Sequence, residues 1–162
     1  MPMNHPFFER CLKPGERALA TVELAAQGSA ALPILEALFS GEAKNQWGIS
    51  YKSLGTPLDC GLIVAARLGE VAKPIERHLV VALKCGHVYA AAALGALGDL
   101  DDISIGELAM TLDGSATLSF EAADALVRCG AAEHPDVTAI TRLSQRAATA
   151  MERVTSGSRP RL

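Results

Sequence analysis

Apolar residues recur along this chain with the spacing of an α-helix. Ile75, Leu79 and Leu83 stand four residues apart, and Ile105 and Leu112 are separated by seven. Residues spaced in this way lie on one face of a helix, whereas a half-buried strand would alternate apolar and polar residues. The chain has no segment with such alternation. The pattern therefore predicts an all-α fold.

Several helix starts are marked by a proline that is followed by an acidic residue. Proline suits the first turn of a helix because its missing N–H is not needed there, and an early carboxylate favours the positive end of the helix dipole. Ser104 and Glu107 also have the spacing of a capping box, so we expect a helix to begin at Ser104. The prolines of this kind are Pro14, Pro57, Pro74 and Pro135.

Glycines stand just beyond the apolar runs, where a left-handed residue commonly ends a helix. These glycines are Gly28, Gly41, Gly69, Gly86, Gly98, Gly114 and Gly130. The start and end signals together predict about eight helices, near residues 14–27, 29–40, 57–68, 74–85, 87–97, 104–113, 117–129 and 135–153. We expect one domain over residues 1–153, with Phe7 and Phe8 docked on the first pair of helices, and a disordered tail over residues 154–162.

The predicted helices group into four pairs that are similar to one another. In each pair the first helix ends in a turn that is rich in Ala and Leu and closed by Gly, written LAAQG, AARLG, LGALG and LVRCG in the sequence. This is an internal repeat of roughly 30 residues, and repeats of this kind bury their apolar faces by stacking on their neighbours. The residues thus predict a stack of helix pairs with a concave side.

One segment of this repeat resembles a known family. Residues Ala91–Asp99 are similar to the A-x-x-A-L-G-x-L-G-D signature of HEAT-like repeats. The resemblance implies an α-solenoid of about four stacked antiparallel helix pairs, a scaffold that most often binds other proteins. Small bacterial members of this group include immunity proteins that block a toxin. The resemblance therefore implies a non-catalytic protein-binding module, and an immunity protein that neutralises a cognate toxin is its most specific form.

Composition and charge narrow the class of partner. Because 49% of the residues are hydrophobic and only 4% are aromatic, we expect a core of small side chains in close contact. A net charge of −3 gives no general attraction for nucleic acid, and no stretch of about 18 apolar residues is free of charge or Gly. The N-terminus lacks the apolar core of a secretory signal. We therefore expect a cytoplasmic protein, monomeric or weakly oligomeric, with neither nucleic acid nor membrane as a partner. Free thiols are expected in such a compartment at Cys11, Cys60, Cys85 and Cys129.

The sequence has no recognisable set of catalytic or metal-binding residues, so we expect neither a metal nor a cofactor. The four histidines form no His-x-x-x-His or His-Glu-x-x-His spacing, and no glycine-rich stretch fits a phosphate site. One alternative of a different class stays open: a HEAT-like lyase, or a small-molecule or chromophore-binding protein, that uses the concave groove. Cys85, His87 and Tyr89 are the residues expected to serve that alternative.

One interval, residues 41–55, is far longer than the other predicted links and contains the only Trp of the chain. Long loops in compact domains often have a function, and aromatic residues supply hot spots of protein interfaces. We therefore expect partner binding at this loop, with Trp47 and Tyr51 as anchors. The alternative is that both aromatic side chains fold back to cover the first pair of helices. The expected partner-binding residues are Lys44, Asn45, Trp47, Tyr51 and Lys52. If the loop does not bind, the next surface consists of Arg77, His78 and Lys84.

Overall fold

The computed structural model describes residues 2–157, and the chain is helical over most of that range. Its extended pairing there is limited to an isolated bridge between Lys44 and Ser50, and no strand forms within these residues. None of the helices of residues 2–157 is long and apolar enough to cross a membrane. The all-α prediction is confirmed.

The described residues form α-helices and four 3-10 helices, one of which precedes α1 while the other three lie in links between α-helices. The α-helices are α1 (Pro6–Leu12), α2 (Arg17–Ala25), α3 (Leu32–Ser40), α4 (Thr56–Leu68), α5 (Glu76–Lys84), α6 (Val88–Ala96), α7 (Asp102–Thr111), α8 (Ala116–Arg128), α9 (Pro135–Leu143) and α10 (Gln145–Thr155). The 3-10 helices of the described residues are η1 (Pro2–Asn4), η2 (Gly28–Ala31), η3 (Tyr51–Leu54) and η4 (Gly69–Ile75).

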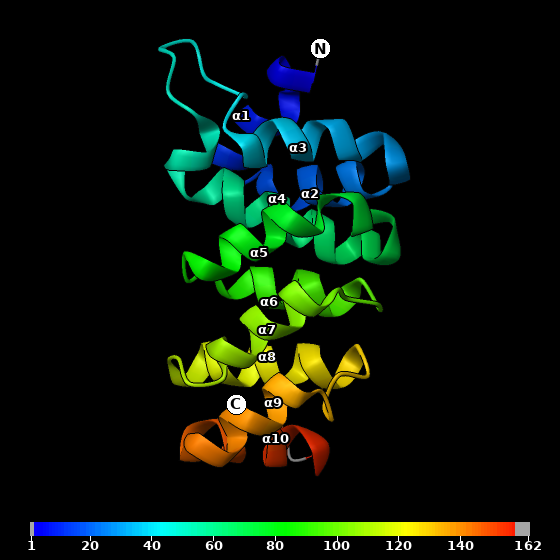
Figure 1. Ribbon diagram of the computed structural model, residues 1–162. Coiled ribbons are helices and arrows are strands. Elements are labelled where there is room, and N and C mark those ends of the chain that lie inside the picture. The colour runs from blue at the N-terminus through cyan, green and yellow to red at the C-terminus, as the bar shows by residue number, and fades with distance from the viewer. Residues whose placement is uncertain (1, 158–162) are drawn as a thin grey trace.

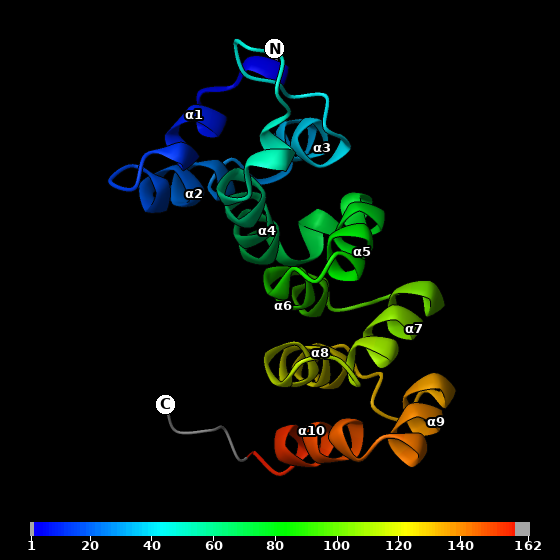
Figure 2. The same cartoon turned by 90° about the vertical axis from the view of Figure 1, so that its left-hand side faces the viewer.

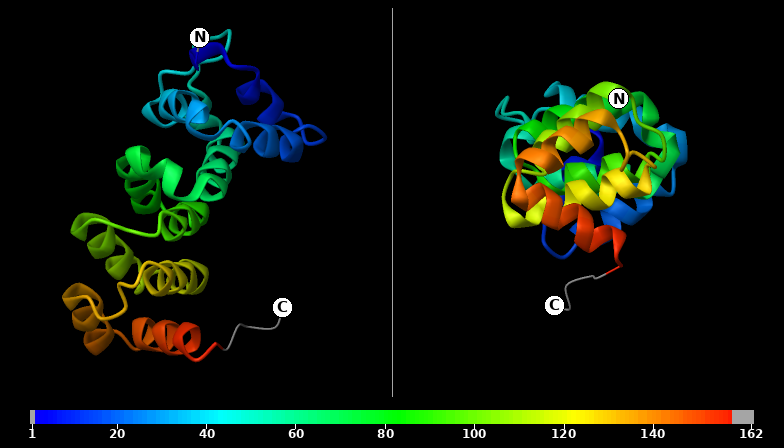
Figure 3. Two further views of the ribbon diagram at one scale, coloured as in Figure 1. Left: turned by 90° about the vertical axis from the view of Figure 1, so that its right-hand side faces the viewer. Right: turned by 60° about the horizontal axis from the view of Figure 1, so that its bottom comes forward.

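The helices stand in two columns that run along the length of the molecule. One column is formed by α2, α4, α6, α8 and α10, and the other by α3, α5, α7 and α9 (Figure 1 and Figure 2). Each helix contacts the next member of its own column. The left panel of Figure 3 shows the same order of helices from the side opposite to that of Figure 2. At the N-terminal end, α1 packs against α2 and α4. The apolar face of each helix is thus buried by its neighbours in the stack.

Each odd-numbered helix packs most closely on the even-numbered helix that follows it. Thus α5 packs on α6 and α7 on α8, whereas η4 separates α4 from α5. The pairing expected from the sequence, which joined residues 57–68 to 74–85 and 87–97 to 104–113, is shifted by one helix. The links explain the shift. The turn at Gly86, whose φ is 88°, reverses the chain within three residues, so α5 and α6 remain in contact.

Small residues let the helices of the even-numbered column approach one another closely. A Cβ atom at Gly95 of α6 would lie 2.9 Å from the Cα of Ala125 on α8, which is closer than such atoms can come. The helix is covered on more than one side, as expected of a helix that is apolar around its circumference. The buried residues of α6 are Ala90, Ala91, Ala93, Leu94 and Gly95.

Two of the four helix starts predicted from prolines are confirmed. Pro57 and Pro135 stand in the first turns of α4 and α9. Pro14 lies in the turn before α2, and Pro74 lies inside η4, so that α5 begins only at Glu76. Proline fixes φ near about −65°, which suits turns and 3-10 helices as well as the first helical turn. It therefore indicates that a helix is near without fixing its first residue.

The predicted capping box at Ser104 is wrong. The helix α7 begins at Asp102, and the carboxylate of Asp101 caps it by accepting the N–H of Ser104 at 2.8 Å. The hydroxyl of Ser104 donates instead to the buried carboxylate of Glu76 at 2.6 Å. Glu76 also accepts the N–H of Asp101 at 3.2 Å and pairs with Lys73 at 2.6 Å. A buried carboxylate is stable only with such partners, so the Ser104 hydroxyl donates to Glu76 and is not used in a capping box. These hydrogen bonds connect α5 to the start of α7.

Both ends of the described chain are helical. Phe7 and Phe8 lie in α1 and are 2% and 0% exposed, so their expected burial is confirmed, although α1 packs on α2 and α4 and not mainly on both members of the expected first pair. At the other end α10 continues to Thr155, so residues 154 and 155 are helical and do not belong to a disordered tail. The last part of the expected tail, residues 158–162, lies outside the described residues.

Candidate functional site

The loop of residues 41–55 follows α3 and projects beyond the helices at the N-terminal end of the molecule (Figure 1). Its two arms are joined by main-chain hydrogen bonds. The N–H of Tyr51 donates to the carbonyl oxygen of Ala43 at 3.0 Å, and the N–H of Asn45 donates to that of Ile49 at 2.9 Å. We call residues 43–51 the Trp47 turn. Its backbone conformation is held by the turn's own hydrogen bonds.

Asn45 organises the tip of the Trp47 turn. Its side-chain oxygen Oδ1 accepts the N–H groups of Trp47 and Ile49, each at 3.0 Å. Its carbonyl oxygen accepts the N–H of Gly48, which has the positive φ of 76° that favours glycine. The sequence predicted a polar contact with a partner at Asn45. In the structure its side-chain oxygen is already used inside the turn.

The tip of the Trp47 turn presents apolar side chains to solvent. Trp47 is 74% exposed and Ile49 is 46% exposed. An indole ring offers a large apolar area together with an N–H donor, and exposed aromatic residues of this kind are enriched at the centres of protein interfaces. Trp47 therefore meets the geometric requirement for the anchor role that the sequence predicted.

Tyr51 lies at the base of the same turn and is 5% exposed. Its ring stacks on Phe8 with a centroid distance of 5.1 Å, and its hydroxyl donates to the carboxylate of Glu9. Burial, together with this hydrogen bond, raises the pKa of Tyr51 to about 12. Tyr51 thus covers α1, and its ring leaves little free surface for the predicted role of partner anchor. The two sequence alternatives are divided between the two aromatic residues.

The two lysines of the loop differ in environment. Lys44 is exposed on the first arm of the turn, and its main chain forms the bridge to Ser50. Lys52 is half-buried and lines a cavity of about 30 Å³ together with Cys85 and His87. Pockets that bind small molecules usually have volumes of about 300–1,000 Å³. The cavity beside Lys52 is therefore too small for a metabolite.

The residues expected for the lyase alternative do not meet in one place. Cys85 and His87 lie at the small cavity beside Lys52. Tyr89, which is 47% exposed, lines a separate cavity of about 440 Å³ together with Arg67. A common site for the three side chains is thus absent from this arrangement of the described residues.

A second surface, whose apolar residues were not singled out from the sequence, follows α5, α7 and α9. Two hollows of about 550 and 540 Å³ lie along these helices and share Ile103. The sequence contained a signal for this surface, because Ile103 and Met110 are seven residues apart and fall on a stripe separate from the buried Ile105. We call this surface the odd-helix face. Its exposed apolar residues are Val81 at 47%, Ile103 at 73%, Met110 at 68% and Leu143 at 85%.

The residues predicted as the next surface belong to the odd-helix face. Arg77 and His78 line the first of its two hollows, and Lys84 forms an ion pair with Glu107 of α7 at 3.4 Å. Burial lowers the pKa of His78, and Lys52 lowers it further although Glu36 opposes this effect. The lowered pKa favours the neutral form of the His78 ring at physiological pH.

In the part of the sequence that the structure describes, no group of three or more His, Cys, Asp or Glu side chains is placed to hold a metal ion.

Comparison with known proteins provides no family for this chain. No protein-family model, no curated protein and no solved structure matches this chain.

Proposed function

We propose that this chain is a non-catalytic, HEAT-like α-solenoid that binds another protein. Two features support the proposal. The helices stack so that each contacts the next member of its own column, and α5 and α7 also contact the helices that follow them, which is how helical repeats bury their apolar faces. The segment Ala91–Asp99, which resembles the HEAT-like signature, supplies the buried face of α6 at the middle of this stack.

The observation that carries the proposal is the exposure of Trp47. An aromatic side chain buries about 150–250 Å² when it is fully enclosed, and about 25 cal/mol is gained per Å² of apolar area removed from water. With 74% of Trp47 still exposed, its burial by a partner is worth about 3–5 kcal/mol. Because Asn45 already fixes the turn, little conformational entropy is lost when the partner binds.

The partner that fits this turn is a protein surface with an apolar pocket. Lys44 is exposed on the arm of the turn and favours acidic side chains at the edge of that pocket. The most specific form of the proposal is an immunity protein that neutralises a cognate toxin. That form is supported by the resemblance of Ala91–Asp99 to HEAT-like repeats.

Photo-crosslinking from the turn can identify the partner. Trp47 is replaced by a photoreactive phenylalanine, the protein is expressed in its native host, and the cross-linked product is identified by mass spectrometry. The matched control carries the same photoreactive residue at Leu19 of α2, which is 56% exposed and lies outside both candidate surfaces. We expect one protein to be cross-linked from position 47 and not from position 19.

The affinity of that partner then tests the role of the side chain. Truncation of an anchor residue costs about 2 kcal/mol or more, so Trp47→Ala should raise the Kd at least about 30-fold, and Leu19→Ala should change it less than about threefold. Isothermal titration calorimetry measures both. Equal affinities for the wild type and Trp47→Ala would show that the turn is not the binding site, and the odd-helix face would then be tested with Ile103→Ala.

A second candidate function is the binding of a small molecule, and one observation favours it. The cavity of about 440 Å³ beside Tyr89 falls within the usual range for ligand pockets and has Arg17, Asp59 and Arg67 in its lining. A ligand bound there should be detected by native mass spectrometry of the protein purified from its host. Tyr89→Ala should then abolish the additional mass.

A further inference from the structure

The side chains of Cys11 and Cys60 meet where α1 packs on α4. The two thiols interact with each other in the interior of the protein, where Cys11 and Cys60 are 0% and 2% exposed. Both are free in the structure. The other two cysteines are placed differently: Cys85 is exposed at the end of α5, and the thiol of Cys129 donates to main-chain carbonyl oxygens at 3.5 and 3.6 Å. Cys11 and Cys60 therefore form a pair that the fold itself brings together.

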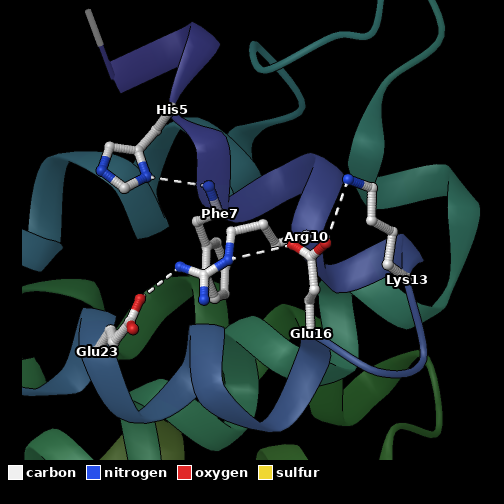
Figure 4. Close-up of polar contacts among 6 residues, drawn as sticks. All are labelled: His5, Phe7, Arg10, Lys13, Glu16 and Glu23. Atoms are coloured by element: carbon white, nitrogen blue, oxygen red, sulfur yellow. Dashed lines mark hydrogen bonds and ion pairs between the residues drawn. The ribbon is translucent and has the colours of Figure 1, made fainter.

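Several contacts hold α1 in the position that creates this pair. The guanidinium of Arg17 donates from Nε to the carbonyl oxygen of Cys11 at 2.9 Å. Arg10 lies between two carboxylates, that of Glu16 in the turn before α2 and that of Glu23 on α2 (Figure 4). The Nε atom of Arg10 is 3.5 Å from the carboxylate of Glu16. These polar contacts add to the burial of Phe7 and Phe8 on the same helix. These contacts hold α1, and Cys11 with it, in place against α2 and α4.

Of the two sulfur atoms, that of Cys60 is the more reactive. Cys60 lines the cavity of about 440 Å³ that also contains Arg17, Arg67 and Tyr89, so a small oxidant can approach it from solvent. The neighbouring Cys11 thiol lowers the pKa of Cys60 against the opposing effect of burial, and Arg17 lowers it further. The interaction with Cys60, together with burial, raises the pKa of Cys11. Because the thiolate is the nucleophilic form, Cys60 should react first.

We propose that Cys11 and Cys60 form a site of reversible oxidation, at which a hydroperoxide converts the two thiols into an intramolecular disulfide between α1 and α4. The Cys60 thiol releases its proton, the thiolate attacks one peroxide oxygen, and the O–O bond breaks. Cys60 becomes a sulfenic acid, while the leaving oxygen takes up the released proton and departs as water or alcohol. The Cys11 sulfur then attacks the Cys60 sulfur and forms the S–S bond. The hydroxide that leaves Cys60 takes the proton of Cys11 and departs as water. The two thiols lose two electrons, which reduce the peroxide.

The experiment uses hydrogen peroxide as the probe and the full chain carrying Cys85→Ala and Cys129→Ala, which retains the two paired cysteines. The folded protein is treated with peroxide, quenched, denatured and examined by thiol titration, intact mass and a non-reducing gel. We expect loss of both thiols, a mass lower by two hydrogens, a monomeric band, and recovery of both thiols with dithiothreitol. The complementary variant, Cys11→Ala with Cys60→Ala, should form no intramolecular disulfide.

Each other outcome would overturn the proposal. Unreacted thiols would show that the oxidant does not reach Cys60, and added oxygen at Cys60 without a disulfide would show that Cys11 does not resolve it. A disulfide-linked dimer would show that the pair does not meet in solution. If the variants fail to fold, peptide mapping of the oxidised wild-type protein decides instead, because a Cys11–Cys60 peptide is expected and any other linkage contradicts the assignment.

Discussion

Glu76 is the residue whose replacement tests the packing of the stack most directly. Its carboxylate is buried at the start of α5 and accepts hydrogen bonds from the hydroxyl of Ser104 and the N–H of Asp101. The same carboxylate pairs with Lys73. We expect Glu76→Ala to lower the free energy of unfolding strongly and Glu76→Gln to lower it less.

The magnitudes follow from the partners of the carboxylate. Hydrogen bonds to a charged group are worth about 1.5–3 kcal/mol, and a buried polar group left without a partner costs about 1–3 kcal/mol. Lys73 is 40% exposed, so solvent compensates it when the ion pair is lost, and that pair contributes little. Glu76→Ala leaves the Ser104 hydroxyl and the Asp101 N–H without their acceptor and should cost about 3–5 kcal/mol. Glu76→Gln keeps one acceptor oxygen for both and should cost about 1–2 kcal/mol.

Urea unfolding followed by circular dichroism measures these differences. Glu133 is exposed and provides the matched control, because Glu133→Ala should change the free energy of unfolding by less than about 0.5 kcal/mol. In a double-mutant cycle, Ser104→Ala should cost less in the Glu76→Ala background than in the wild type, since the two share one hydrogen bond. A loss below about 1 kcal/mol for Glu76→Ala, or independent effects in the cycle, would refute the assigned role.

Three further predictions concern the packing, the turn and the pH dependence. Gly95→Ala should lower the free energy of unfolding by about 1–3 kcal/mol because its Cβ would press on the backbone of α8, whereas Gly15→Ala, with nothing within 4 Å, should not; thermal melts compare the two. Tyr51→Ala should cost about 3–5 kcal/mol of stability, and Trp47→Ala less than about 0.5 kcal/mol; equal losses for the two would contradict the division of roles within the loop. The neutral ring of His5 caps α1. Burial lowers the pKa of His5, and the N-terminal charge and Arg10 lower it further. Because the unfolded chain therefore binds this proton more readily than the folded protein, the free energy of unfolding should fall as the pH drops below about 6.5. Urea unfolding at pH 7.5 and 5.5 measures this loss, which should be smaller in His5→Asn because asparagine keeps a cap that does not titrate.

The helical nature of the chain could be read from its sequence, but the pairing of the helices could not. Helical periodicity is a local property, and the buried Leu79 and Leu108 follow it. Pairing depends on which faces meet across the stack. The central helix α6 is apolar on several sides, so its sequence does not select one partner. The link η4 was also indistinguishable from the start of α5, because Pro74 suits either conformation.

The same distinction between local and distant causes explains the loop. The role of Asn45 is local. Its side chain accepts the N–H groups two and four residues ahead, and a glycine stands three residues ahead, so the local sequence can indicate this turn. The burial of Tyr51 is not local. It depends on Glu9, which is 42 residues away in the sequence, and on the ring of Phe8 beside it. For this reason the two aromatic residues of one loop could not be told apart until α1 was placed.

The position of Tyr51 also explains how Trp47 can remain exposed without loosening the loop. The base of the turn is held on α1 by the stacked ring of Tyr51, and the tip is held by the oxygen of Asn45, so neither end relies on burial of the indole. An exposed tryptophan contributes little to folding, and its large apolar area is hydrated in the free protein. The free energy of removing that area from water is therefore available to the partner binding that we propose, and the rigid turn limits the entropy that such binding must oppose.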